Sequence, residues 1–348
     1  MASQQHHVII GNGVAGVRAA TVLREREPDN RITIISIGGL LFYDRYQLPQ
    51  VFAGKRDWRT YLVHPPEYYE DKRISVRRKC RVTQVDTRRR VLTLAHREEV
   101  GYDTLLIASG GGGYLPPRLS EYVPLFNYFG TYRAAVTTAD ALPDRGTAIM
   151  LGGDILGIDV AHTIAATGHR VILITSEQVF WPHKVAPEEQ PRLFEALEHA
   201  GIEVVQNGAI ERIEAAANGG AARRVVLSDG RTIAGDVVMP FYGLMPSLEF
   251  MVGSGVDIER GLLVSPTLKT TDAHIWAAGD VCQIWSAEDN AYRFYYGWKN
   301  VKAMGELAAR NISGAEEPFQ TAGPETLTVD PRGRVHSSFW DHDQVPRT

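Results

Sequence analysis

The stretch Val8-Ile9-Ile10-Gly11-Asn12-Gly13-Val14-Ala15-Gly16 places a complete G-x-G-x-x-G directly after an apolar run. Glycines at this spacing make the tight turn between a strand and a helix, and they let the backbone approach a pyrophosphate. Apolar spacing predicts a helix over 14–27, and Arg31-Ile32-Thr33-Ile34-Ile35-Ser36 predicts the next strand. The stretch therefore predicts the opening β-α-β unit of a doubly wound α/β sheet.

A second unit repeats this plan around Ile149-Met150-Leu151-Gly152-Gly153-Asp154-Ile155-Leu156-Gly157. We expect a strand over 147–151, a helix over 155–167 and a strand over 170–175. Asp154 stands where the middle glycine belongs. Its side chain would block the close approach of a pyrophosphate, and its charge would repel the phosphates. The alternative is that Asp154 turns outward as a helix cap.

In an intact site, the end of the second strand carries an acid that binds the ribose of NADH. Here that strand end carries Thr175 and Ser176. No arginine follows to suit the 2′-phosphate of NADPH. We therefore expect a degenerate NAD(P) site at Gly152, Asp154, Gly157 and Thr175.

Length, charge and cysteine content exclude several classes of protein. The chain has 348 residues, more than one compact domain usually holds, and its net charge of −4 gives no case for nucleic-acid binding. Cys80 and Cys282 are too few for a disulfide framework or a cysteine-rich metal site. We find no signal peptide and no apolar run that could span a bilayer, so a cytoplasmic location is expected.

Four motifs in chain order resemble the two-dinucleotide-binding-domain flavoproteins, which are pyridine nucleotide-disulfide oxidoreductase-like proteins. The branch they resemble holds ferredoxin and rubredoxin reductases and the flavin domain of assimilatory nitrite reductases. The motifs are the first fingerprint, Tyr43-Asp44-Arg45, Leu106-Ile107-Ala108-Ser109-Gly110, and the segment from Ile275 to Asp280. The resemblance spans roughly residues 6–314.

The resemblance implies two Rossmann-like domains, the first of them discontinuous and carrying an antiparallel β insertion, with a shortened C-terminal region. It assigns 1–113 and 253–316 to an FAD-binding domain, 114–252 to a degenerate NAD(P)-binding-like domain, and 317–348 to a tail. The sequence also predicts a last helix over 298–312, and the resemblance implies that its dipole would face the flavin. The acid expected after the second strand is replaced by Ser36. The implied FAD-binding residues are Gly11, Gly13, Val14, Ala15, Gly16, Ser36, Arg45, Ser109, Gly110, Gly279, Asp280 and Trp298.

The segment near flavin N5 departs from the family pattern. Gln50 occupies the slot of a lysine, and Asp159 occupies the slot of its glutamate partner. Losing a cation at N5 gives less help to hydride acceptance. Neither cysteine lies within 42–54, so thiol chemistry is not supported. The catalytic group expected is the flavin itself, with Gln50 and Asp159 near it.

Partner surfaces are expected at two places, the basic segment 72–97 and the tail 317–348. Ten Lys or Arg residues in the basic segment would suit an acidic redox protein, and the alternative is a solvated sheet edge. The tail would anchor the chain on another subunit of a larger complex, or it would fold back on its own chain. The aromatic side chains of 276–298 would cover the flavin or simply pack in the core. His336, Asp341, His342 and Asp343 fit no known metal site, so no metal is expected.

These observations lead to an FAD-dependent oxidoreductase that passes electrons between its flavin and a protein or small-molecule partner, with NAD(P)H use doubtful. Two alternatives remain open. The first is a functional NAD(P)H-dependent ferredoxin or rubredoxin reductase, and the second is a non-catalytic FAD-holding subunit of a larger complex.

Overall fold

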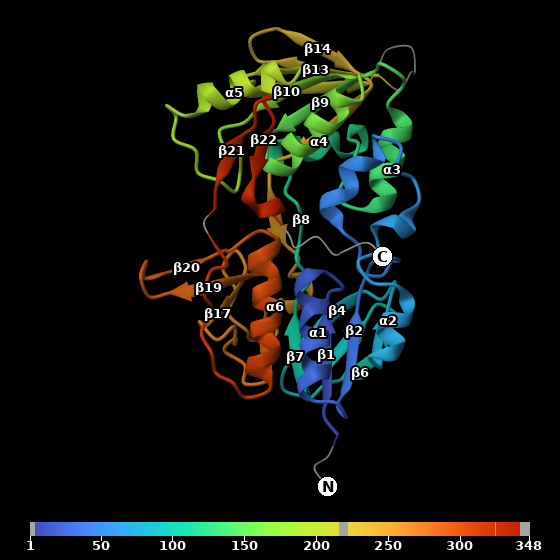
Figure 1. Ribbon diagram of the computed structural model, residues 1–348, viewed down its shortest axis with the longest axis vertical. Coiled ribbons are helices and arrows are strands. Elements are labelled where there is room, and N and C mark those ends of the chain that lie inside the picture. Colours follow the sequence, from blue (N-terminus) through green and yellow to red (C-terminus); the bar gives the residue numbers. More distant parts are fainter. Residues whose placement is uncertain (1–3, 216–221, 324, 342–348) are drawn as a thin grey trace.

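The computed structural model describes residues 4–215, 222–323 and 325–341. The molecule is elongated, with two lobes placed one above the other (Figure 1). Each lobe is built on a parallel sheet, and the two predicted glycine turns lie in different lobes.

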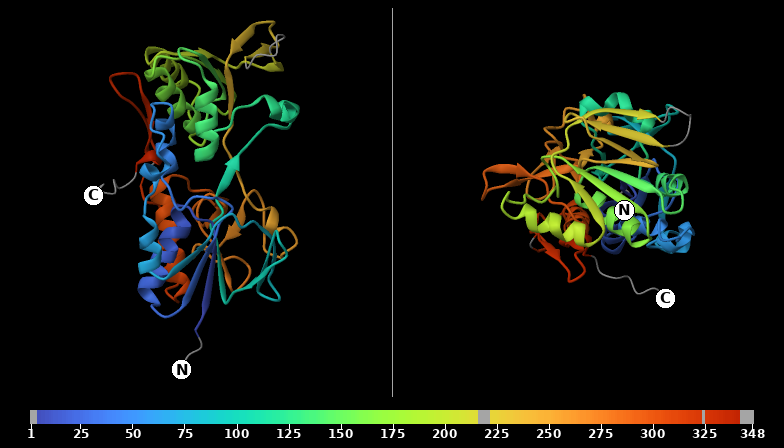
Figure 2. Two further views of the ribbon diagram at one scale, coloured as in Figure 1. Left: turned by 90° about the vertical axis from the view of Figure 1, so that its right-hand side faces the viewer. Right: turned by 90° about the horizontal axis from the view of Figure 1, so that it is seen from above.

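The first sheet has the strand order β18-β7-β1-β2-β3, and all its neighbours pair in parallel. Helix α1 and the last helix, α6, lie side by side along one face of this sheet (Figure 2). The elements of this layer are β1 (His6–Ile10), α1 (Val14–Arg26), β2 (Arg31–Ile35), β3 (Ile74–Arg77), β7 (Thr104–Ile107), β18 (Ile275–Ala277) and α6 (Trp298–Ile312).

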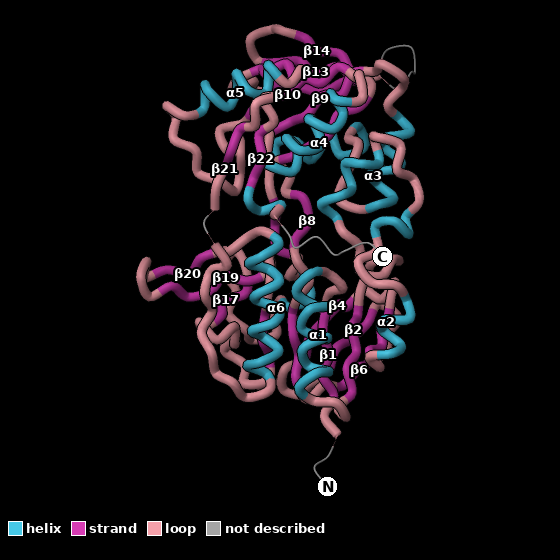
Figure 3. Tube along the Cα trace, viewed as in Figure 1, coloured by secondary structure: helices cyan, strands magenta, loops and turns pink. Residues whose placement is uncertain are grey.

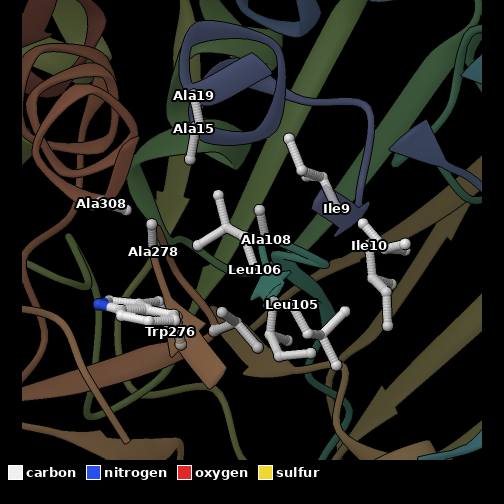
Figure 4. Packing of buried hydrophobic residues seen from close by; sticks show 14 of the residues in the cluster. Ile9, Ile10, Ala15, Ala19, Leu105, Leu106, Ala108, Trp276, Ala278 and Ala308 are labelled. Carbon is white, nitrogen blue, oxygen red and sulfur yellow. The ribbon is translucent and has the colours of Figure 1, made fainter. Parts of the chain in front are cut away.

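Helices α1 and α6 approach so closely that only a glycine fits between them. A Cβ atom on Gly305 would lie 2.3 Å from the carbonyl oxygen of Ala15. Ile9, Leu106 and Trp276 are all under one-tenth exposed and pack in the layer beneath (Figure 4). This packing fixes the start of α1 relative to the strand ends, where the first fingerprint lies.

The second sheet has the order β11-β10-β9-β15 and is also parallel throughout. Its elements are α3 (Tyr132–Ala141), β9 (Thr147–Gly152), α4 (Ile155–Ala166), β10 (Arg170–Thr175), α5 (Gln190–His199), β11 (Ile202–Val205) and β15 (Val237–Phe241). An antiparallel sheet accompanies it, made of β12 (Ile210–Ala215), β13 (Arg223–Leu227) and β14 (Thr232–Gly235).

The chain crosses between the lobes along two strands that pair with each other. Strand β8 (Gly111–Gly113) runs antiparallel to β16 (Leu244–Pro246). The hydroxyl of Ser109 donates to the carbonyl of Ser247, and Ser247 N–H donates to the carbonyl of Gly110. The outgoing and returning segments are therefore tied together. The exact domain boundaries stay a prediction.

The remaining elements are short, and Figure 3 shows how much loop connects them. They are η1 (Arg45–Val51), η2 (Trp58–Tyr61), α2 (Pro66–Asp71), β4 (Val82–Asp86), β5 (Val91–Leu94), β6 (Glu99–Gly101), η3 (Pro117–Leu125), η4 (Glu249–Met251), β17 (Leu262–Val264), β19 (Cys282–Ser286), β20 (Ala291–Arg293), β21 (Leu327–Val329), β22 (Val335–Ser337) and η5 (Ser338–Trp340). Strands β4, β5 and β6 form the predicted antiparallel insertion. No helix in the described ranges is long and apolar enough to cross a lipid bilayer.

Candidate functional site

The turn before α1 uses its three glycines for different purposes. Gly11 has a φ of +117°, and a Cβ there would lie 1.9 Å from the carbonyl oxygen of Ala108. A Cβ on Gly16 would lie 2.1 Å from the carbonyl oxygen of Gly11. A Cβ on Gly13 would meet nothing within 4 Å. Gly11 and Gly16 are thus required by the chain's own packing, whereas the space beside Gly13 is open.

The N-terminus of α1 offers unpaired donors. Gly13 caps the helix without a side-chain hydrogen bond, and the first turn holds no acidic residue. In the part of the chain that the structure describes, no acceptor is bonded to the backbone N–H groups of Val14, Ala15 and Gly16. The buried amide oxygen of Asn12 in the same turn has no hydrogen-bond partner among the described residues. Free N–H groups at a helix N-terminus bind phosphate, so these residues fit the pyrophosphate of FAD.

Arg45 and Asp280 lie close enough to influence each other. Burial raises the pKa of Asp280 to about 6, and the positive charge of Arg45 opposes that rise. A Cβ on Gly279 would lie 3.4 Å from Val301 on α6 and 3.6 Å from Ala15 on α1. The end of β18 and the starts of both helices therefore converge, and it stays a prediction that these residues surround FAD.

Trp298 begins α6 at the predicted position and is almost fully buried. Its ring stacks on Phe42 with centroids 5.9 Å apart and meets Tyr46 edge-on at 5.6 Å. Ser36 is engaged locally, because its hydroxyl oxygen accepts from Gly38 N–H at 3.1 Å. Ser109 and Gly110 serve the crossing between the lobes, as described above.

The turn before α4 differs from the turn before α1 because the chain fills it with its own acceptors. Asp154 is buried, with one carboxylate oxygen accepting from Gly157 N–H and the other from Gly243 N–H, each at 2.8 Å. The N–H of Ile155 donates to the carbonyl of Trp181 at 3.0 Å. Burial raises the pKa of Asp154 to about 6, and the backbone N–H donors oppose the rise.

This geometry corrects the expected orientation of Asp154. The side chain is the N-cap of α4, as the alternative held, but it turns inward to Gly243 rather than outward. Thr175 is also engaged, since its hydroxyl oxygen accepts from Asn207 N–H at 2.9 Å. The contributions of Trp181 and Gly243 were missed by the sequence analysis. Both act through backbone atoms, which carry no residue-specific signal.

Gln50 and Asp159 come from elements that pack together, η1 and α4. Gln50 is half-buried. The cation that pairs with Asp159 is Arg334 of the tail, with 2.5 Å between the guanidinium nitrogen and the carboxylate oxygen. Burial raises the pKa of Asp159, and Arg334 opposes this rise. Sequence reasoning did not find Arg334, because nothing local to the tail indicates this partner.

The described part of the tail folds back as a hairpin of β21 and β22 against α4 (Figure 1). Val335 N–H donates to Nε2 of buried His162 at 3.0 Å. Nε2 of His183 lies 2.7 Å from the hydroxyl of Ser337. The same segment reaches the first lobe, where Trp340 packs on Tyr46 with centroids 4.5 Å apart. The described part of the tail therefore folds onto its own chain, and its use as a partner surface stays a prediction.

Acidification is expected to weaken the docking of the tail. Burial lowers the pKa of both His162 and His183 from 6.5 to about 4, so the docked state favours neutral rings. The docked state therefore has its full stability above pH 6.5 and loses stability as the pH falls toward 4. For His162 the loss between about pH 7 and 5 is about 2 kcal/mol. Urea unfolding across this range measures it.

The matched variant is His162→Gln, which keeps an acceptor for Val335 N–H but does not titrate. Its free energy of unfolding should depend less on pH than that of the wild type. Equal pH dependence in both proteins would show that His162 does not contribute.

The basic segment 72–97 is divided between two sheets, because β3 belongs to the first parallel sheet whereas β4 and β5 belong to the antiparallel insertion. Glu98 neutralises Arg77, and Glu99 neutralises Arg89. The basic patch is therefore smaller than its sequence suggests.

The aromatic group of 276–298 separates into distinct places. Trp276 is buried in the hydrophobic core of the first lobe. Trp285 contacts Tyr292 on the β19–β20 hairpin, and Tyr296 contacts Trp181. Sequence proximity was misleading here because β19 and β20 form a hairpin that leads the chain away from the strand ends. Within the described ranges, no three His, Cys, Asp or Glu side chains gather as a metal site. His342 and Asp343 lie outside these ranges.

The family model described as pyridine nucleotide-disulphide oxidoreductase matches residues 5–302. The chain is 25% identical over 320 residues to the NADH-dependent phenylglyoxylate dehydrogenase subunit epsilon of Aromatoleum evansii, covering 91% of this chain and 72% of the relative. It is 24% identical over 322 residues to the rubredoxin-NAD(+) reductase of Pseudomonas putida, covering 90% and 81%.

The fold is also that of solved reductases. A ferredoxin reductase from Rhodopseudomonas palustris superposes with a TM-score of 0.84 at 24% identity, covering 93% of this chain and 80% of that one. The family match spans both glycine turns and the convergence of β18, α1 and α6. The chain belongs to the pyridine nucleotide-disulphide oxidoreductase family and is an FAD-dependent oxidoreductase.

Proposed function

We propose that this protein passes electrons between FAD bound at the first glycine turn and a redox partner, and that its second turn does not accept a nicotinamide dinucleotide. When bound, FAD supplies the capacity to take up and release electrons. The chain's residues bind and orient it. The open N-terminus of α1 holds the pyrophosphate, Arg45 adds positive charge, and Asp280 accepts hydrogen bonds from the ribityl chain.

The observation that carries the proposal is the contrast between the two helix N-termini. The N–H groups of Val14, Ala15 and Gly16 have no bonded acceptor among the described residues. The corresponding group on α4, Ile155 N–H, is bonded to Trp181, and Gly157 N–H is bonded to Asp154. A pyrophosphate entering the second turn would have to displace these acceptors and approach a buried carboxylate, which is unfavourable.

The names of relatives favour a second candidate, a nicotinamide-dependent reductase. The relatives include a rubredoxin-NAD(+) reductase and a ferredoxin--NAD(P)(+) reductase. In that case Asp154 would be a tolerated cap, displaced or rearranged when the nucleotide binds. The relative named as a subunit of phenylglyoxylate dehydrogenase supports the further candidate of a subunit in a larger complex, with FAD held structurally.

The partner we propose is an acidic redox protein. Support comes from relatives named for rubredoxin and ferredoxin. Arg78, Lys79 and Arg88 are exposed and have no ion pair with any described carboxylate. Positive charge of this kind speeds encounter with an acidic protein and makes the rate depend on salt.

The visible spectrum of the purified protein tests the proposal. We expect a flavin band that neither NADH nor NADPH bleaches under anaerobic conditions and that dithionite does bleach. Near-stoichiometric bleaching by either nucleotide would favour the nicotinamide-dependent reductase. A protein that carries no flavin would contradict both enzymatic candidates.

A further inference from the structure

The first glycine turn has neighbours at the same sheet edge. Strands β1, β2 and β3 are parallel, and their registers align Ile10 with Ile35 and Ile35 with Arg77. The next residues along these strands are Gly11, Ser36 and Arg78. Neighbouring strands lie about 4.8 Å apart. Ser36 and Arg78 therefore lie along the same edge of the sheet as the dinucleotide crevice, each one strand further from the fingerprint.

The loops after β2 and β3 are bonded to each other. Lys79 N–H donates to the carbonyl of Gly38, and Cys80 N–H donates to the carbonyl of Ser36. The guanidinium of Arg78 donates to the carbonyl of Gly39 at 3.0 Å. Lys79 has a φ of +57°, uncommon for a long side chain, and its Cε lies 3.4 Å from the place of a Cβ on Gly39. These bonds hold both cations against the loop that follows β2.

We call Ser36, Arg78 and Lys79 the ribose corner. No described carboxylate lies within ion-pair distance of Arg78 or Lys79, whereas the neighbouring Arg77 is paired with Glu98. The loop 36–42 contains no acidic residue. In this fold an acid after the second strand binds the ribose hydroxyls, whereas a nearby arginine accommodates a phosphate on the ribose.

We propose that the ribose corner binds a phosphate attached to the adenosine ribose of a nucleotide held at the first turn. Adenosine nucleotides with a 2′- or 3′-phosphate would then compete with FAD, whose own ribose carries only hydroxyls. Each cation contributes a charge-assisted hydrogen bond to such a phosphate. The proposal rests on the proposed function, because it takes the first turn as the site of FAD.

Release of FAD from the holoprotein tests the competition, since free FAD can be followed by its fluorescence. NADP+ and NAD+ differ only in the 2′-phosphate, and coenzyme A and dephospho-coenzyme A differ only in the 3′-phosphate. We expect one phosphorylated nucleotide, or both, to release FAD at a concentration about tenfold lower than its unphosphorylated counterpart, a difference of about 1.4 kcal/mol. The pair that shows the difference identifies the position of the phosphate.

The double variant Arg78→Gln with Lys79→Gln should lose this preference and retain FAD as well as the wild type does. Arg88→Gln, an exposed charge removal in the same basic segment, should keep the preference. Equal release by both members of each pair would overturn the ribose corner while leaving FAD binding intact. A preference that survives in the double variant would overturn it too. A protein without FAD would contradict the proposed function instead, and calorimetry with NADP+ and NAD+ would then test the corner directly.

Discussion

Replacing Gly13 by alanine is expected to leave the fold intact and weaken FAD binding about 100-fold. The added methyl would meet no protein atom within 4 Å, and Gly13 has a φ of −110°, which alanine adopts without strain. The same methyl would occupy the space through which a pyrophosphate approaches the backbone. Crowding of this kind costs about 3 kcal/mol, which corresponds to about 100-fold in affinity. FAD titration of the apoprotein measures this loss.

Gly11→Ala is the contrasting variant. Its methyl would overlap the carbonyl of Ala108, and the φ of +117° would be strained for alanine. We expect its free energy of unfolding to fall by about 3 kcal/mol or more. We expect Gly13→Ala to unfold like the wild type and Gly11→Ala to have a lower free energy of unfolding. This result would show that the space beside Gly13 is left for the ligand, whereas the lack of a side chain at Gly11 is required by the packing of the protein. Unchanged FAD affinity in Gly13→Ala would contradict the assignment of the first turn.

Elements with a local cause could be predicted closely from the sequence. The helix expected over 298–312 is α6 with the same bounds, and those over 14–27 and 155–167 end one residue earlier as α1 and α4. Each begins at or beside a glycine or a capping residue and carries an apolar stripe, so its signal lies within its own residues. The parallel sheets followed from the alternation of strands and helices.

The candidate site was predictable only where it depends on residue type. The three glycines, Arg45 and Asp280 belong to motifs. The structure places β1 and β18 on the two sides of β7, with Gly279 beside Ala15 of α1. The pairing of Asp159 with Arg334 joins residues far apart in the chain, and no local pattern indicates it. The tail hairpin was likewise hidden, because its stability comes from contacts with α4 rather than from its own short strands.

Asp154→Gly is expected to tighten NADH binding about 100-fold. Two like charges about 4 Å apart repel by about 4 kcal/mol at an effective dielectric constant of 20, and the substitution removes this repulsion. It also frees the N–H groups of Gly157 and Gly243, which Asp154 now occupies. The bond from Ile155 N–H to Trp181 remains, so part of the gain is lost. A net gain of about 3 kcal/mol corresponds to about 100-fold.

Asp154→Asn is the matched control, because it removes the charge and keeps the bulk. Its amide oxygen can accept from one of the two N–H groups, but its NH2 group faces the other donor. We expect it to fold less stably and to gain less NADH affinity than Asp154→Gly, because close approach to the turn stays blocked. Equal gains in both variants would mean that charge alone excludes the nucleotide. A folded Asp154→Gly protein with no gain in NADH affinity would show that Asp154 is not what closes the second turn.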